Sequence, residues 1–202
     1  MARLGYSPDE VRHVILTHLD LDHCGGLADF PRADVHVLAR EHEAAMLRRT
    51  LSERSRYQPI NWRHRPRWVL HHPDEGDRWF GFASVRAISD LPPELLILPL
   101  HGHTRGHAGV AVETPDGWLL HAGDAYFFEG ETDPVSPRCT PGLDVFQRLV
   151  AIDDVARRAN QERLRALRRA HGDEVRIFSA HDPAELAAFP APAPVELVAS
   201  AR

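Results

Sequence analysis

The 202-residue sequence lacks lysine altogether, so all 24 of its basic residues are arginine. A catalytic lysine Schiff base and the phosphate-binding lysine of a Walker loop are therefore excluded. Two cysteines, Cys24 and Cys139, are too few to build a disulfide framework. No apolar run approaches the ~18 residues that a membrane-spanning helix needs, and the N-terminal segment lacks the apolar core of a secretory signal peptide. From these absences we expect a cytoplasmic protein without a membrane span.

The composition is that of an ordinary globular protein. Hydrophobic residues make up 43% and charged residues 26% of the chain, close to globular averages. We therefore expect one domain over residues 1–189, followed by an Ala/Pro-rich tail at 190–202. A net charge of -5 argues against a broad nucleic-acid-binding surface. The expected partner is a small-molecule substrate, with no nucleic acid and no membrane, and nothing in the sequence indicates the oligomeric state.

Helical and strand-like patterns alternate along the chain. Ser7, followed by a proline and two acids, is typical of a helix start. A helix is predicted over 41–51, and helical character returns over 143–171. The polar segment 52–75 is interpreted as a surface excursion or a flap over a site. Short apolar runs predict strands at 14–16, 35–38, 85–88, 95–100, 109–113, 118–120 and 175–179. This interleaving indicates an α/β or mixed α+β fold.

Histidine is abundant, with 14 residues, and several of them gather in four short segments at the ends of predicted strands. In open α/β sheets such strand-end loops converge on one crevice. Imidazole and carboxylate groups suit Zn²⁺, Fe²⁺ or Mn²⁺, and these segments supply more of them than one catalytic metal needs. The surplus indicates two metals that share a carboxylate. The segments are His18-x-Asp20-x-Asp22-His23, the HGHTRGH stretch from His101 to His107, Gly123-Asp124 and Ser179-Ala180-His181.

In this order, the four segments resemble the metallo-β-lactamase-fold hydrolase superfamily, in particular its lactonase and glyoxalase-II-like branches. That family has an HxHxDH loop after a strand, a downstream GHTxGH segment, an aspartate after a glycine and a final histidine after a late strand. The resemblance runs from His18 to His181 and covers most of the chain. It implies an αββα sandwich and a metal-dependent hydrolase that is binuclear.

The resemblance also implies the ligands of two divalent transition-metal ions, zinc in the first place and iron or manganese as alternatives. The two ions would hold a hydroxide between them as the nucleophile. Asp22 would also accept or relay a proton, and His107 would support its loop rather than bind a metal. The implied ligands are His18, Asp20 and His103 for the first metal, Asp22, His23 and His181 for the second, and Asp124 as the bridge.

The sequence departs from the family pattern in three places. Asp20 stands where the family has its second histidine, and this harder, anionic ligand favours iron or manganese more than an all-imidazole site does. Arg105 replaces a frequent proline, and it is either a solvated loop residue or a contact for an anionic group of the substrate. The family's strands that precede the first motif have no counterpart before His18, so we expect a sheet that lacks N-terminal strands.

Two residues beside the motifs are of interest. Tyr126 lies one position before the site at which lactonases of the family place a substrate-facing tyrosine, which makes it a candidate for contact with a substrate oxygen. Cys24 directly follows a proposed ligand and is interpreted as a small buried residue under the loop.

The function that these observations favour is the hydrolysis of a small ester, lactone or thioester. One alternative is a glyoxalase-II-like thioesterase, although the Ala/Pro tail does not resemble the basic helical region of those enzymes. A second alternative is a catalytically inert metal-binding protein, or a fragment that needs a partner to complete its sheet.

Overall fold

The computed structural model describes residues 5–73, 77–86 and 95–189, so the predicted tail at 190–202 and the end of the predicted strand at 85–88 lie outside the described residues. The first half of the chain forms a parallel sheet of order β1-β2-β3. Its strands are β1 (His13–Ile15), β2 (Asp34–Leu38) and β3 (Arg67–His71). The predicted helix start is confirmed, because the Ser7 side chain caps a single 3-10 turn.

The single helix predicted over 41–51 is wrong, because the chain forms two shorter helices there. Helix α2 (Ala39–Leu47) ends at Arg48, whose φ of 42° lies in the left-handed region. Thr50 then caps helix α3 (Leu51–Arg56) through a capping box. Most of the polar segment 52–75 that the structure describes belongs to α3, to a 3-10 turn and to β3.

The second half of the chain builds a five-stranded sheet of order β10-β9-β8-β7-β6. Strand β10 pairs with β9 in parallel, and the remaining neighbours are antiparallel. A separate hairpin joins β4 (Arg78–Trp79) to β5 (Phe82–Ala83). The strands of the larger sheet are β6 (Val85–Arg86), β7 (Leu95–Pro99), β8 (Ala108–Thr114), β9 (Gly117–His121) and β10 (Val175–Phe178).

The predicted helical region near the C-terminal end consists of α4 (Pro141–Val150) and α5 (Asp154–His171). The side chain of Asp153 caps α5 and thereby separates the two helices, and Gly172 ends α5 as predicted. Two shorter helices complete the described fold, α1 (Leu21–Cys24), which carries the end of the first histidine-aspartate segment, and α6 (Pro183–Ala187), which follows the last segment.

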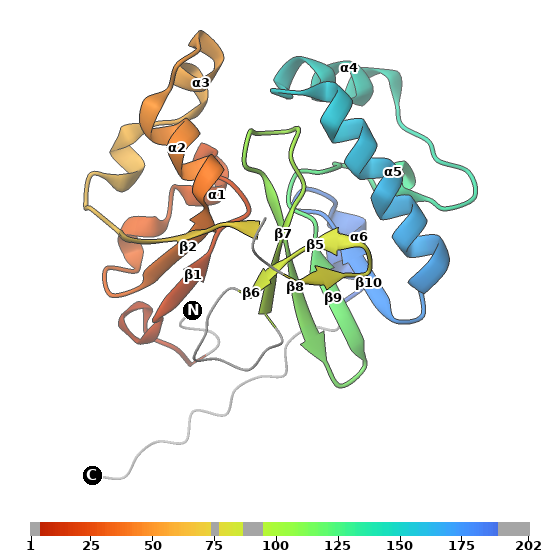
Figure 1. The fold of residues 1–202 in the computed structure, drawn as a ribbon, viewed down its shortest axis with the longest axis horizontal. Coiled ribbons are helices and arrows are strands. Elements are labelled where there is room, and N and C mark those ends of the chain that lie inside the picture. Colours follow the sequence, from red (N-terminus) through yellow and green to blue (C-terminus); the bar gives the residue numbers. More distant parts are fainter. Residues whose placement is uncertain (1–4, 74–76, 87–94, 190–202) are drawn as a thin grey trace.

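The two sheets pack face to face, with helices on their outer sides. Alternation along β2 explains this, because successive side chains of a strand point to opposite faces. Val35 and Val37 pack with residues of α2, whereas Leu38 packs with Ile97 of the second sheet. On the far side, Leu164 of α5 covers the second sheet. Figure 1 shows the resulting order, with α1–α3 on one side, α4 and α5 on the other and β7 and β8 between them.

Three histidines form a ladder across the first sheet, on the face that also carries Leu38. Nδ1 of His13 lies 3.1 Å from Nε2 of His36, and Nδ1 of His36 lies 3.0 Å from Nε2 of His71. Burial, together with the neighbouring His36 and His72, lowers the pKa of His71 to about 4. The ladder is a second concentration of imidazole groups, separate in sequence from the predicted ligands.

Candidate metal centre

All four predicted segments meet at one edge of the sandwich, as their positions at strand ends indicate. The chain leaves β1 and reaches His18, leaves β7 and reaches His103, and leaves β9 and reaches Asp124. His181 follows β10, which runs parallel to β9 and therefore ends at the same edge. The convergence expected from the sequence is thus present in the structure.

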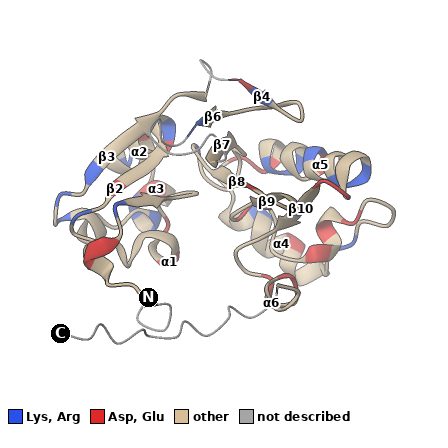
Figure 2. Ribbon diagram, turned by 90° about the horizontal axis from the view of Figure 1, so that it is seen from below, with Lys and Arg blue, Asp and Glu red and all other residues tan. Residues whose placement is uncertain are grey.

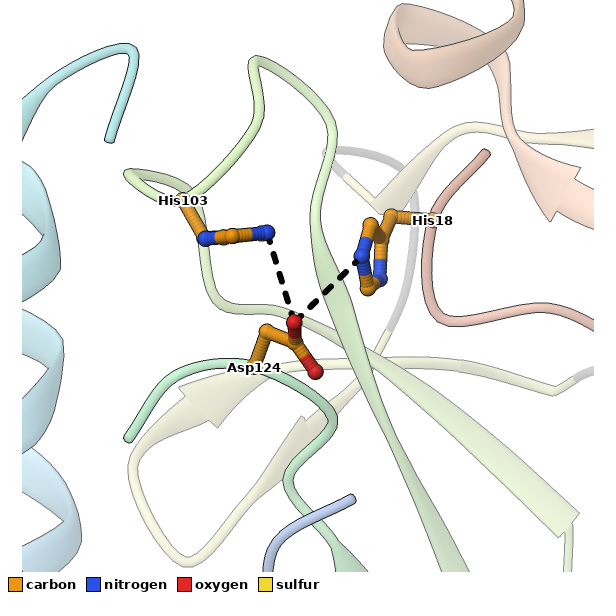
Figure 3. Close-up of side chains that lie close together, drawn as sticks. All are labelled: His18, His103 and Asp124. Atoms are coloured by element: carbon orange, nitrogen blue, oxygen red, sulfur yellow. Dashed lines mark ion pairs between the residues drawn. The ribbon is translucent and has the colours of Figure 1, made fainter. Parts of the chain in front are cut away.

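The carboxylate of Asp124 lies between the two predicted groups of ligands. Its Oδ2 is 3.8 Å from Nε2 of His18 and 3.4 Å from Nε2 of His103 (Figure 3). The same oxygen is 3.3 Å from Nε2 of His181, and Oδ1 is 3.2 Å from Nε2 of His23. The carboxylate of Asp124 therefore contacts histidines of both predicted groups.

The first group of ligands is buried. His18 is fully enclosed and His103 is 4% exposed. Oδ2 of Asp20 lies 3.5 Å from Nε2 of His18 and 3.1 Å from Nε2 of His103. Asp20 occupies the N-cap position of α1 but makes no capping bond, so its carboxylate is free to turn toward these two histidines.

The second group of ligands opens to solvent. The Asp22 side chain is 61% exposed and that of His181 is 38% exposed. Oδ2 of Asp22 is 3.5 Å from Nε2 of His23 and 3.4 Å from Nε2 of His181. Asp22 and His23 lie together on the short helix α1, whereas His181 comes from the far end of the sequence.

Opposite charges tune the protonation of the centre. Burial alone would raise the pKa of Asp124, but contacts with His181 and His23 lower it well below its usual range. Burial alone would lower the pKa of His18, but the carboxylates of Asp20 and Asp124 raise it above its usual value. The carboxylate of Asp124 is thus favoured in its ionised form, which attracts cations.

The donor set fits transition-metal ions. The ligand atoms of His18, His103 and Asp124 all lie within 4.8 Å of one another, and so do those of Asp22, His23 and His181. Nε2 of His18 and Oδ1 of Asp124 are buried and make no hydrogen bond within the part of the chain that the structure describes. Since buried polar atoms are normally satisfied, both atoms fit the role of ligands that would face a cation.

His107 lies behind the predicted ligands and contacts the loop of Asp124. Its ring is fully buried, with Nδ1 2.9 Å from the carbonyl oxygen of Leu100. Its Nε2 accepts a hydrogen bond of 2.8 Å from the backbone N–H of Asp124. Gly123 has a φ of 55°, and a Cβ at this position would lie 2.6 Å from Nε2 of His107. Only glycine therefore allows this approach.

Glu41 is a structural carboxylate that sequence analysis missed. It is fully buried at the start of α2 and accepts hydrogen bonds from the backbone N–H of Leu19 and the hydroxyl of Tyr57. It also accepts from the Thr104 hydroxyl and the Gly106 N–H. Glu41 thus ties the loop of His18 to the loop of His103. Its sequence position resembles an ordinary acid in the first turn of a helix, so no local signal identifies it.

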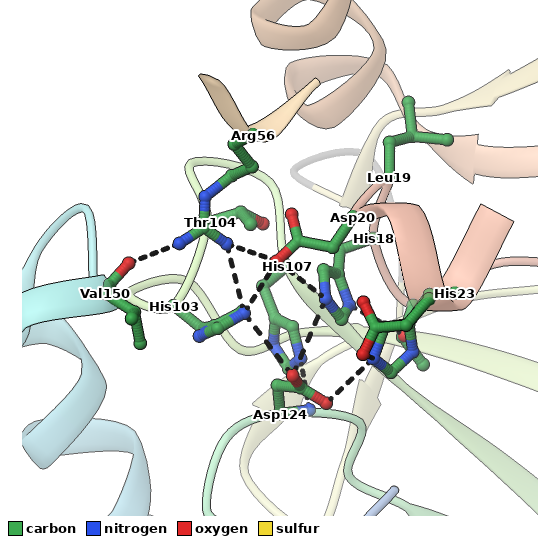
Figure 4. A network of polar contacts seen from close by, with 12 residues as sticks. His18, Leu19, Asp20, His23, Arg56, His103, Thr104, His107, Asp124 and Val150 are labelled. Carbon is green, nitrogen blue, oxygen red and sulfur yellow. Dashed lines mark hydrogen bonds and ion pairs between the residues drawn. The ribbon is translucent and has the colours of Figure 1, made fainter. Parts of the chain in front are cut away.

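Arg56 was missed as well, because it is one of many arginines. The guanidinium reaches from the end of α3 into the centre, where Nη1 donates to Oδ2 of Asp20 at 2.5 Å and lies 3.1 Å from Nε2 of His103 (Figure 4). Nη2 donates to the carbonyl oxygen of Val150 at the end of α4. Arg56 therefore connects the N-terminal and C-terminal halves across the site.

A cavity of about 710 Å³ lies over the centre. One wall is apolar and comes from α4 and Phe127, and the opposite wall is polar and comes from α3. The lining residues are Asp20, Leu21, Asp22, Ser52, Ser55, Arg56, His103, Asp124, Phe127, Leu143, Phe146, Leu149, Val150 and His181.

Three other residues considered from the sequence lie away from this cavity. Tyr126 is fully buried, and its hydroxyl donates to Glu185 at 2.8 Å. Arg105 pairs with the buried Glu53. Cys24 is buried as expected, and burial raises the pKa of its thiol to about 11.

Comparison with known proteins identifies the class. The chain matches the model of the metallo-beta-lactamase superfamily over residues 1–181. It belongs to this family, and the helix-sheet-sheet-helix sandwich is the fold of the family.

Particular relatives are similar over parts of their length. A probable metallo-hydrolase of Mycobacterium tuberculosis is 41% identical over 181 residues, which are 90% of this chain and 58% of the relative. An N-acyl homoserine lactonase of Bacillus thuringiensis is 27% identical over 114 residues, or 56% of this chain and 38% of that protein. This chain thus spans little more than half the length of the first relative.

Solved structures share the fold. An N-acyl homoserine lactone hydrolase, solved with the product N-hexanoyl-L-homoserine at its catalytic metal centre, superposes with a TM-score of 0.67. The identity is 22%, and the match covers 94% of this chain and 63% of that one. A probable metal-dependent hydrolase from Staphylococcus aureus gives a TM-score of 0.67 at 17% identity, over 90% of this chain and 58% of that one. Within the described residues, no helix has the length and apolar character that crossing a membrane requires.

Proposed function

We propose that the protein is a metal-dependent hydrolase with a binuclear centre that cleaves a small ester, lactone or thioester. The observation that carries the proposal is the place of Asp124, whose carboxylate lies within 3.8 Å of histidines from both groups: Oδ2 contacts His18, His103 and His181, and Oδ1 contacts His23. His18, Asp20 and His103 would hold the first ion, and Asp22, His23 and His181 the second. We expect zinc, with iron or manganese as the alternatives that the carboxylate of Asp20 favours.

When bound, two divalent ions supply a hydroxide nucleophile at neutral pH and polarise the oxygen of the scissile group. The chain's own residues orient the reaction. Asp22 is exposed at the cavity, where its carboxylate can accept a proton and pass it to the leaving group. The apolar wall from Phe146 and Leu149 packs against a hydrophobic part of the substrate and holds its carbonyl group over Asp124.

The shape and charge of the cavity favour a small molecule. Its volume of about 710 Å³ is in the range of small-ligand pockets. Figure 2 shows acidic and basic residues on both halves of the molecule, and the net charge of the chain is -5, which disfavours nucleic acid as the substrate. The lactonase names of several relatives support lactones as the first substrates to test.

The first test is the metal content of protein purified without added metal or chelator. We expect close to two transition-metal ions per chain, and hydrolysis in a panel of lactones, esters and thioesters. Asp22→Ala is expected to abolish turnover while the protein keeps its fold. Rapid hydrolysis of S-lactoylglutathione would favour a glyoxalase-II-like thioesterase, and a loaded, folded protein that is inactive throughout the panel would favour an inert metal-binding protein.

A further inference from the structure

Arg56 gives the two proposed metal sites different surroundings. Its guanidinium contacts two ligands of the first site, Asp20 and His103, at 2.5 Å and 3.1 Å from Nη1. The ion pairs that Asp22 makes within the described residues are with His23 and His181. An arginine thus contacts two ligands of the first site, whereas the ion pairs of Asp22 are with the other ligands of the second site.

The conflict with a metal is sharpest at His103. Its Nε2 faces Asp20 and Asp124 and is the ligand atom of the first site. An imidazole nitrogen has a single acceptor lone pair, so Nε2 can accept a hydrogen bond from Arg56 or bind a metal ion, but it cannot do both. An aspartate oxygen has two lone pairs, so Asp20 does not impose the same choice.

Arg56 has a stable position when it leaves His103. Nη2 is bound to the carbonyl oxygen of Val150, the last residue of α4. A cation is favoured at a helix C-terminus, where carbonyl groups lack partners and the helix dipole is negative. Arg56 can therefore release the ligand and stay anchored beside the cavity.

We propose that Arg56 competes with the first metal ion for Nε2 of His103, so that the second site fills at lower metal concentration and Arg56 sets the affinity of the first. The inference rests on the binuclear centre of the proposed function. It predicts that the two ions bind in separate steps, with the weaker step belonging to His18, Asp20 and His103.

The test is a calorimetric titration of metal-free protein with zinc. Wild-type protein is expected to show a tight and a weak step. Arg56→Gln is expected to strengthen the weak step by about ten- to a hundredfold, the factor that corresponds to charge-assisted hydrogen bonds, and to leave the tight step unchanged. Arg54→Gln is the matched control, because Arg54 lies on the same helix, is exposed, and bonds to the carbonyl oxygen of Arg48 instead.

A second background isolates the first site. His181→Ala removes a ligand of the second site only. Zinc binding is therefore compared between His181→Ala and the double variant that also carries Arg56→Gln, and this comparison measures the first site alone. Arg56→Met serves as an additional variant, and circular dichroism verifies that each protein is folded.

The outcomes are distinct. Weaker zinc binding in Arg56→Gln would mean that Arg56 supports Asp20 as a ligand, and would overturn the proposal. Two equal steps that Arg56→Gln leaves unchanged would overturn it too, although the binuclear centre would stand. Absence of zinc binding in every variant would overturn the metal centre, and with it the proposed function.

Discussion

Two groups of histidines in this molecule differ in what surrounds them. The histidines of the metal centre alternate with carboxylates, above all Asp124, and the pKa of His18 is raised. The histidines of the ladder contact one another, and the pKa of His71 is lowered to about 4 by burial and by neighbouring imidazoles. The same residue type therefore lies among carboxylates in one place and among other imidazoles in the other. The carboxylates are what equip the first group, and not the second, to attract a cation.

The largest effect is expected when the centre loses its shared carboxylate. Asp124→Asn removes the charge that faces both ligand groups, so we expect both ions to dissociate and turnover to fall by about a thousandfold or more, the effect of losing several kcal/mol of transition-state stabilisation. Metal analysis and steady-state kinetics check this result. Asp116→Asn is the control, because Asp116 lies in the exposed turn between β8 and β9. Retention of two ions in Asp124→Asn would show that Asp124 is not the bridge.

The next effect concerns the carboxylate behind the centre. Glu41→Gln weakens the four hydrogen bonds that tie the loops of His18 and His103 together. We expect the free energy of unfolding to fall by about 2–3 kcal/mol, because a buried carboxylate with charge-assisted bonds is replaced by an amide with one acceptor oxygen. Denaturant unfolding measures this loss. The neighbouring Glu43→Gln on the exposed side of α2 is expected to change it by less than about 0.5 kcal/mol, and equal effects of the two variants would contradict the role of Glu41.

The ladder is expected to respond to acid. A histidine whose pKa is lowered in the folded state binds protons more readily when unfolded. The contribution of His71 to the free energy of unfolding is therefore fully present above its ordinary pKa of 6.5. This contribution is lost as the pH falls toward the folded-state pKa of about 4.

His71→Gln removes this term, so its unfolding free energy should depend less on pH between these two values than that of wild-type protein. The measurement uses metal-free protein, and metal content should be unchanged in the variant. His64→Gln, at an exposed site, should keep the wild-type pH dependence. A variant of His71 that follows the wild-type curve would refute the ladder's contribution.

The smallest effect on stability is expected at the open side of the centre. His181→Ala truncates a partly exposed side chain. In the metal-free state, its free energy of unfolding should therefore be lower than that of wild-type protein by less than about 0.5 kcal/mol. In the metal-loaded state, the variant should lack the second ion. His18→Ala, at a fully buried position, should cost about 1–3 kcal/mol. Comparable losses from both variants would mean that burial does not distinguish the two ligand groups.

Much of the centre follows from the sequence. The segments around His18, His103, Asp124 and His181 each follow a strand, and strand ends on one edge of a sheet have to come together. The pattern of apolar runs likewise predicts most of the strands. The helix predicted over 41–51 failed because Arg48 adopts a left-handed backbone conformation, which no local pattern announces. Strand β3 was missed because its exposed residues hide the alternation.

The sequence by itself determined which side chains can bind metal and in what order they occur, because ligand chemistry and strand-end position are local properties. Only the tertiary structure decided that Arg56 reaches His103, that Glu41 joins two loops and that Tyr126 is bound to Glu185. These contacts join residues far apart in the chain. Arginine and glutamate are common on solvated helices, so their roles depend on which distant atoms the packing of the two halves brings within hydrogen-bond distance.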